Sequence, residues 1–159
     1  MDDVIIMGKS NFRKIKGTEG FALVEVMVSA VIMILAFVGI LVTYMKCMEL
    51  NEMSRNKSMA TKAAKTRMEL INTSAFSSLT ANYNNIPFLP AVRMAGVSYI
   101  NTTNPDLAQI VVSVCWRQKN GLLVGEDADL DGVLDAGEDT NGNGMIDSPV
   151  QLVTFRYDE

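Results

Sequence analysis

The stretch from Phe21 to Met45 reads FALVEVMVSAVIMILAFVGILVTYM, and it decides the fold of this chain. Its 25 residues include a single charged side chain, Glu25. As an α-helix they extend about 37 Å, more than the roughly 30 Å hydrocarbon core of a bilayer. Lipid offers no hydrogen-bonding partners, so a segment that spans it must pair its own backbone groups, as a helix does. The stretch therefore predicts a transmembrane helix over residues 21–45, in preference to the buried helix of a soluble protein.

Basic residues flank this apolar stretch unequally. Four lie shortly before it, at positions 9, 13, 14 and 16, whereas Lys46 alone follows closely. Positively charged flanks remain in the cytoplasm, so residues 1–20 should face inward and the C-terminal part outward. A cleaved secretory signal is the weaker interpretation, because its apolar region is shorter and a small-residue cleavage site follows it.

Glu25 is unusual because it lies inside the apolar stretch. A carboxylate within a membrane helix costs a few kcal/mol unless it is paired, and the default interpretation of such a residue is functional. The alternative is an interfacial acid whose carboxylate simply reaches the lipid headgroups.

Residues 20–25 read GFALVE, follow a short basic leader and open the long apolar segment. This combination resembles the processing motif of type IV prepilins and of the pseudopilins of type II secretion. The match rests on Gly before Phe, an acid five residues into the apolar segment, the basic leader and the long helix together. Ala22 stands where Thr or Ser is more usual, and the proline found in the helix of many pilins is missing.

The resemblance implies a role for three of these residues. Gly20 would precede the bond that a prepilin peptidase cuts on the cytoplasmic side, and Phe21 would become the N-methylated first residue. Glu25 would pair with the amino terminus of a neighbouring subunit during assembly. Such pairing has a physical basis, because cleavage creates a cation at Phe21 and a buried carboxylate favours an opposite charge.

The helical pattern continues beyond Met45 but becomes amphipathic. Apolar residues recur at roughly helical spacing, and neither Pro nor Gly occurs from Lys46 to Ile71, which predicts a helix over residues 46–72. Residues 60–79, ATKAAKTRMELINTSAFSSL, resemble the helix end of minor pilins and minor pseudopilins. Four basic residues occupy other positions, for which a solvated face is favoured over one that binds a nucleic acid such as DNA: Lys57, Lys62, Lys65 and Arg67.

Residues 73–159 are expected to form a head that contains a small antiparallel sheet. Ser, Asn, Thr and Pro are frequent in residues 72–90, which predicts a connecting loop. Strands are predicted at residues 92–100, 109–118 and 150–157, where apolar residues alternate with others. The predicted fold class is α+β, with one long N-terminal helix packed on the sheet.

The middle strand shows the clearest alternation. The face that should cover the helix consists of Ile110, Val112, Val114 and Trp116. Cys115 falls on the opposite face, whereas Cys47 lies on the helix. A disulfide between the two is therefore geometrically disfavoured, and two unpaired thiols are expected.

Acidic residues concentrate in one segment near the C-terminal end. Eight of the 18 Asp and Glu residues lie between Glu126 and Asp147, with no Lys or Arg among them. Residues 127–138, DADLDGVLDAGE, match the calcium-binding loop of EF-hands in full, including the glycine at the sixth position. The predicted calcium ligands are Asp127, Asp129, Asp131, the carbonyl of Val133, Asp135 and Glu138.

The next twelve residues, 139–150, repeat the spacing incompletely. Their predicted ligands are Asp139, Asn141, Asn143, the carbonyl of Met145 and Asp147. Val150 stands where the bidentate acid is required, so this loop should bind calcium more weakly or share ligands such as Glu138 with the first. No flanking helices are predicted, so the pair is similar to calcium repeats of extracellular proteins. Calcium would order the head, as it does in several pilins and pseudopilins; the alternative is an acidic linker without a metal.

These features exclude some functions and favour others. The chain has no His and no evident nucleophile–base pair, so it is not expected to be an enzyme. The resemblance implies a structural subunit, a minor pilin or pseudopilin, of a type IV pilus or a type II secretion pseudopilus. Its partners would be a prepilin peptidase, other subunits and the lipid of the bacterial inner membrane, where the precursor would keep its head outside the cytoplasm. The alternative is a single-pass, membrane-anchored calcium-binding module for adhesion or sensing that does not assemble.

Overall fold

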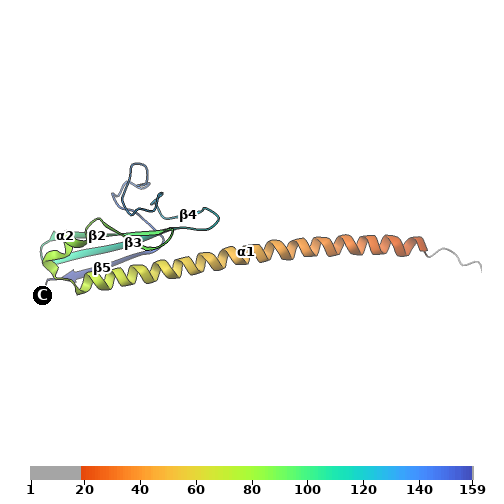
Figure 1. Cartoon of the computed structure of the whole chain (residues 1–159), viewed down its shortest axis with the longest axis horizontal. Helices are drawn as coiled ribbons and strands as arrows, with labels where there is room; N and C mark the ends of the chain where they lie inside the picture. The colour runs from red at the N-terminus through yellow and green to blue at the C-terminus, as the bar shows by residue number, and fades with distance from the viewer. Residues whose placement is uncertain (1–18, 159) are drawn as a thin grey trace, which may run out of the picture. The chain divides into compact units, whose positions relative to one another are not determined.

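A computed structural model describes residues 19–158 of the chain, and it describes side chains from residue 22 onward (Figure 1). Residues 1–18, which make up most of the predicted leader, lie outside this description. The chain divides into two compact units, Met1–Lys46 and Cys47–Glu159.

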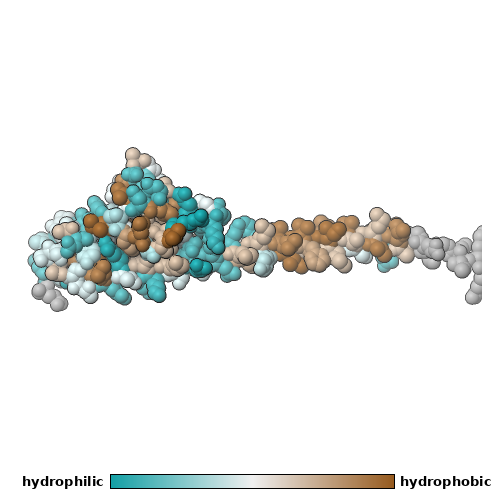
Figure 2. Space-filling model, viewed as in Figure 1, coloured by the Kyte–Doolittle hydropathy of each residue, from teal (hydrophilic) through white to brown (hydrophobic). Residues whose placement is uncertain are grey.

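The first unit contains the apolar part of helix α1, which begins at Glu19 and ends at Thr73 in the second unit. Every side chain from residue 22 to residue 46 is exposed. Mean hydropathy reaches 2.8 over a window in which no residue is buried, and Figure 2 shows this run in brown. The hydroxyl of Thr43 donates to the carbonyl of Gly39 (2.9 Å), so this polar group is satisfied within the helix. By length and composition this helix could span a membrane, as the sequence predicts.

The second unit packs the C-terminal part of α1 on a sheet. The buried face of the helix recurs every three or four residues and consists of Ala60, Ala64, Met68 and Ile71. All four belong to the main core cluster, together with residues of the strands. The helix predicted over residues 46–72 is thereby confirmed, with its end at Thr73.

Five antiparallel strands form the sheet: β1 (Ile86–Ala91), β2 (Met94–Asn104), β3 (Leu107–Arg117), β4 (Leu123–Val124) and β5 (Gln151–Tyr157). β3 is central, because β2 pairs with one of its edges while β4 and β5 pair with successive parts of the other. The connection between β4 and β5 therefore leaves the sheet and returns to the same strand. The predicted α+β fold is confirmed, and the three predicted strands correspond to β2, β3 and β5.

The two faces of β3 contribute to two clusters. The face toward α1 carries the residues predicted from alternation: Ile110, Val112, Val114 and Trp116. On the other face Cys115 joins Val97 and Ile146 in a smaller cluster. Cys115 is buried and unpaired, and Cys47 is exposed and unpaired, as predicted.

The prediction of a plain loop over residues 72–90 is wrong. This segment holds the 3-10 helix η1 (Phe76–Ser78), helix α2 (Leu79–Tyr83) and most of β1. Leu79 is fully buried, and Phe76 and Tyr83 pack against the main core. The prolines of β1 are compatible with a strand because β1 lies at the edge of the sheet, where one side needs no ladder hydrogen bonds.

Arg67 requires a second correction, because it is half-buried and does not share the exposed face of the three helix lysines. Its guanidinium lies over the rings of Tyr83 (4.9 Å to the centroid) and Phe88 (5.0 Å). A planar, weakly hydrated guanidinium suits this position between aromatic rings. Burial lowers the pKa of Arg67 from its usual value.

Strand β5 also holds the end of α1. Nη1 of Arg156 donates to the carbonyls of Ile71 (3.2 Å) and Ser74 (2.7 Å). Ile71 lies in the last turn of α1 and Ser74 directly follows its end, so Arg156 attaches β5 to the C-terminal end of the helix.

Candidate metal centre

Two consecutive twelve-residue loops fill the connection between β4 and β5. The first covers residues 127–138 and the second residues 139–150, and neither contains a helix or a strand. At the sixth position of each loop lies a glycine with positive φ: Gly132 at +80° and Gly144 at +75°. A residue with a side chain is strained in this left-handed region, so the sequence pattern and the backbone agree.

Asp127 organises the first loop. Its side chain is only 1% exposed, and its carboxylate accepts hydrogen bonds from three backbone N–H groups. The donors are Leu130 (2.6 Å), Asp131 (3.2 Å) and Gly132 (2.9 Å). The loop is therefore wrapped around this carboxylate.

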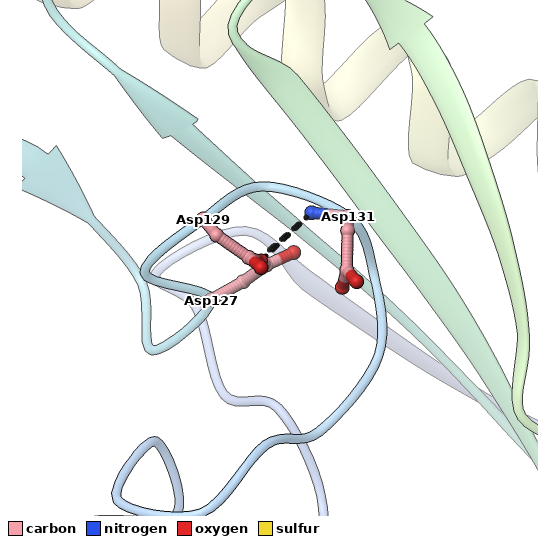
Figure 3. Close-up of side chains that lie close together, drawn as sticks. All are labelled: Asp127, Asp129 and Asp131. Atoms are coloured by element: carbon pink, nitrogen blue, oxygen red, sulfur yellow. Dashed lines mark hydrogen bonds between the residues drawn. The ribbon is translucent and has the colours of Figure 1, made fainter.

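Two further aspartates lie beside Asp127 (Figure 3). Oδ1 of Asp129 accepts the N–H of Asp131 (3.2 Å), and Oδ1 of Asp131 accepts the N–H of Val133 (2.7 Å). One carboxylate oxygen from each of the three aspartates lies within 4.8 Å of the others. Carboxylate oxygens held this close are suited to a hard divalent cation such as calcium.

The second loop repeats four of these five backbone contacts, all except the one that Leu130 makes with Asp127. Asp139 accepts the N–H groups of Asn143 (3.0 Å) and Gly144 (2.8 Å), as Asp127 does at the equivalent positions. Oδ1 of Asn141 accepts the N–H of Asn143 (3.0 Å), and Oδ1 of Asn143 accepts the N–H of Met145 (2.8 Å). The sequence repeat is thus also a structural repeat.

Asp147 connects the side chains of the second loop. Its Oδ2 accepts hydrogen bonds from the amide nitrogens of Asn141 (2.5 Å) and Asn143 (2.8 Å), and its Oδ1 accepts one from Gln151 at the start of β5 (3.0 Å). Three predicted ligand positions are therefore linked, and the loop is joined to the returning strand.

The two remaining acids of the first loop lie outside the close group of three aspartates. The side chain of Asp135 is exposed. Glu138 is 7% exposed, and its two oxygens accept the N–H groups of Ala128 (2.6 Å) and Asp135 (3.0 Å). Glu138 therefore joins the end of the loop to its beginning. The other two predicted positions, Val133 and Met145, directly follow the glycines.

Sequence reasoning missed Glu126. Its Oε2 accepts the N–H of Asp147 (3.0 Å), and its Oε1 accepts the hydroxyl of Thr140. This acid thus braces the second loop, which lacks an acid at its last position, Val150. A signal existed: Glu126 is the one acid between residues 126 and 147 that occupies no position of either loop pattern.

Both loops are attached to the outer face of the sheet. Their eighth residues, Leu134 and Ile146, belong to the small cluster around Cys115. The hydroxyl oxygen of Tyr99 accepts the N–H of Ile146 (2.7 Å), and the hydroxyl of Ser148 donates to the carbonyl of Val114 (2.5 Å). The acidic segment is therefore part of the folded head.

The electrostatics of the first loop favour a bound cation. Burial raises the pKa of Asp127, opposed by the N–H groups of Gly132 and Leu130. The negative charge of Glu138 also raises the pKa of Asp127. Arg117 of β3 donates to the carbonyl of Ala128 at the start of the loop. Several carboxylates confined at this density repel one another, and a divalent cation would relieve that repulsion.

The residues predicted for processing and assembly lie in α1. Gly20 and Phe21 belong to its first turn, although the side chain of Phe21 lies outside the description. Glu25 is exposed, and within residues 22–158 no hydrogen bond or ion pair engages its carboxylate.

No protein-family model, curated protein or solved structure matches this chain. Its function must therefore be inferred from three features: the apolar helix that carries Glu25, the head built on α1 and the two acidic loops.

Proposed function

We propose that this chain is a structural subunit of a type IV pilus or a type II secretion pseudopilus, of the minor pilin or pseudopilin kind. It would be made as an inner-membrane precursor and matured by a prepilin peptidase between Gly20 and Phe21. One observation carries the proposal: α1 leaves its side chains from residue 22 to residue 46 uncovered, yet buries a stripe against an antiparallel sheet farther along.

The uncovered part of α1 requires a cover. Large apolar side chains such as Leu35 (67% exposed) and Phe37 (60%) are unfavourable in water. Lipid would cover them in the precursor, and the equivalent helices of other subunits would cover them after assembly. The same surface thus supports both stages of the proposed pathway.

Glu25 would direct the packing of subunits. A carboxylate in an apolar helix is costly without a partner, and removal of the leader would create an ammonium group at Phe21 of each subunit. Pairing Glu25 with the amino terminus of a neighbour would satisfy both charges in a low-dielectric environment. It would also fix the axial register between adjacent helices.

Calcium belongs to this proposal as a structural ion of the head. Asp127, Asp129 and Asp131 would hold it in the first loop, where N–H groups already orient their carboxylates. The second loop would offer Asp139, Asn141, Asn143 and Asp147, with fewer charges. When bound, calcium would supply positive charge and oxygen coordination. Sites outside the cytoplasm need only weak affinity, with dissociation constants on the order of 10⁻⁴–10⁻³ M.

Intact mass and N-terminal sequencing of the protein from native membranes test the proposal. A chain that begins at methylated Phe21 is expected. A chain that retains residues 1–20 in cells with an active prepilin peptidase would contradict it and would favour the membrane-anchored calcium-binding module.

Substitution of Glu25 tests the assembly step separately. Glu25→Ala should leave membrane insertion intact and abolish or strongly reduce incorporation into sheared filaments or pseudopili. Ser29→Ala is the matched control, because it removes a polar group from the same apolar segment without removing a charge. Normal assembly of Glu25→Ala would show that the charge pairing is not needed.

A further inference from the structure

Three segments of the second unit meet at one end of the sheet. They are the part of α1 from Glu52 to Met59, the turn between β1 and β2, and the turn between β3 and β4. Oε1 of Glu52 accepts the backbone N–H of Lys119 (2.8 Å), and the backbone N–H of Arg117 donates to the carbonyl of Arg93 (3.0 Å). Together they line a hollow of about 500 Å³.

The lining of this hollow is strongly basic. It includes one acid, Glu52, and four bases: Arg55, Arg93, Arg117 and Lys119. Within residues 22–158, no hydrogen bond or ion pair engages the side chains of Arg55, Arg93 or Lys119. Cations gathered without acidic partners raise the local positive potential, and such a surface attracts anions.

An apolar side chain stands beside these cations. Val92, in the turn between β1 and β2, is 94% exposed. The next residue, Arg93, has φ of +63°, a left-handed conformation that is strained for a residue with a side chain. An exposed valine has no favourable interaction with water at this position. At a membrane surface, by contrast, it would enter the apolar side of the headgroup layer while the neighbouring cations faced the phosphates.

The apolar segment of the same chain would tether this hollow to a membrane. Glu52 follows Met45, the last residue of the apolar stretch, by seven residues. A segment of seven residues reaches at most about 25 Å, whatever the orientation of the two units. Insertion of the apolar segment would therefore keep the basic hollow within reach of the lipid headgroups.

We propose that this end of the head, through Val92 and the side chains of Arg55, Arg93 and Lys119, binds the anionic headgroups of the membrane that holds the apolar segment. The proposal rests on the proposed function in one respect, the insertion of residues 21–45. A nucleic acid would offer similar phosphates, but it would provide no apolar layer for Val92 and no tether. Anionic lipid is therefore the occupant that fits both the charge and the exposed valine.

The test uses the full chain reconstituted in vesicles of phosphatidylcholine, with or without phosphatidylglycerol. A fluorophore is attached to Val92→Cys in a Cys47→Ser background, and its quenching by headgroup-labelled lipid is measured. Thr102→Cys is the control site, because it lies at the opposite end of β2. Quenching is expected at position 92 in vesicles that contain phosphatidylglycerol, and at neither site in neutral vesicles.

Charge substitutions test the residues themselves. Arg55→Gln, Arg93→Gln and Lys119→Gln together should reduce the ratio of membrane-bound to free heads roughly 100-fold, since each cation near an anionic surface contributes about fivefold. The matched control removes three exposed cations of α1 that do not line the hollow, and it should leave quenching unchanged: Lys57→Gln, Lys62→Gln and Lys65→Gln.

Alkaline extraction of the same vesicles separates the possible failures. A protein that resists extraction but shows no quenching at position 92, or equal quenching with and without phosphatidylglycerol, overturns this inference alone. A protein that is extracted contradicts both this inference and the proposed function. If a DNA duplex instead binds through the same three cations while position 92 remains unquenched, the surface serves a nucleic acid and the inference fails.

Discussion

The two acidic loops form similar backbone turns but differ in how much of each is buried in the head. Asp127 and Glu138 of the first loop are almost fully buried, and Gly132 lies against β1. In the second loop Asn141, Asn143 and Gly144 are all exposed. Four equivalent N–H contacts therefore form in two environments. The spacing of the acids and the glycine specifies the backbone turn. Contact with the sheet determines how much the stability of the head depends on that turn.

Substitution of the two equivalent glycines should show the largest contrast. A Cβ at Gly132 would lie 2.6 Å from Cβ of Pro87 and 3.0 Å from the carbonyl oxygen of Gly96, whereas a Cβ at Gly144 has no neighbour within 4 Å. Gly132→Ala should lower the free energy of unfolding by about 3 kcal/mol, and Gly144→Ala by about 1 kcal/mol, the cost of positive φ alone. Urea denaturation in calcium measures both, and equal losses would mean that contact with the sheet does not distinguish the loops.

The apolar eighth residues of the loops show the opposite difference in burial. Ile146 of the second loop is 1% exposed, whereas Leu134 of the first is half-buried. Ile146→Ala should cost about 3 kcal/mol and Leu134→Ala about 1 kcal/mol, because the cost follows the apolar contacts that are lost. The same denaturation experiment applies. A larger loss for Leu134→Ala would contradict the proposed attachment of the second loop through its eighth residue.

Removal of charge tests the cation sites without breaking the turns. Asp129→Asn with Asp131→Asn keeps an acceptor oxygen at each position but removes two charges, as does Asp139→Asn with Asp147→Asn in the second loop. Saturating calcium at 100 times the dissociation constant stabilises a fold by about 2.7 kcal/mol. We expect the first pair to remove most of the calcium-dependent rise in melting temperature and the second pair to remove less. In chelator both variants should melt close to the unsubstituted protein, and a large loss there would argue against a bound ion as the cause.

The bracing acids should have local effects. Glu138→Gln removes a charge that accepts two N–H groups in a buried position, and should destabilise the first loop by about 2 kcal/mol. Glu126→Gln acts at a less buried site and should destabilise the second loop by about 1 kcal/mol. Amide exchange at Ala128 and Asp147 reports the two openings separately. An unchanged exchange rate at Asp147 in Glu126→Gln would show that Glu126 does not stabilise the second loop.

The smallest expected effect is on the pH dependence of the stability of the calcium-free head. Burial raises the pKa of Asp127 in the folded state, so folding favours its protonated form. Its contribution to the free energy of unfolding should be present at pH values below the ordinary pKa of an aspartate. It should be lost as the pH rises through the raised pKa of the folded state. Melting in chelator across this acidic range should show a component that Asp127→Asn removes. A component that persists in Asp127→Asn would belong to other carboxylates.

The sequence was sufficient for the long helix, three of the strands and the paired loops, because each is a periodic pattern. It was insufficient for β1 and α2, whose apolar residues are separated by Ser, Asn, Thr and Pro and show no period. Arg67 was misplaced for the same reason, since its aromatic neighbours lie in that segment. Glu126 was missed because its partners, Thr140 and Asp147, lie in the second loop, and only the folded chain brings them together.

The excursion between β4 and β5 also bears on the speed of folding. Ser113 of β3 pairs with Gln151 of β5, so the residues between them must be looped out before the sheet can close. The entropy lost in closing a flexible loop grows with the logarithm of its length, by about 0.6 kcal/mol per doubling. Two turns that form locally around Asp127 and Asp139 shorten the effective loop. The acidic repeats should therefore hasten the docking of β5 as well as stabilise the finished head.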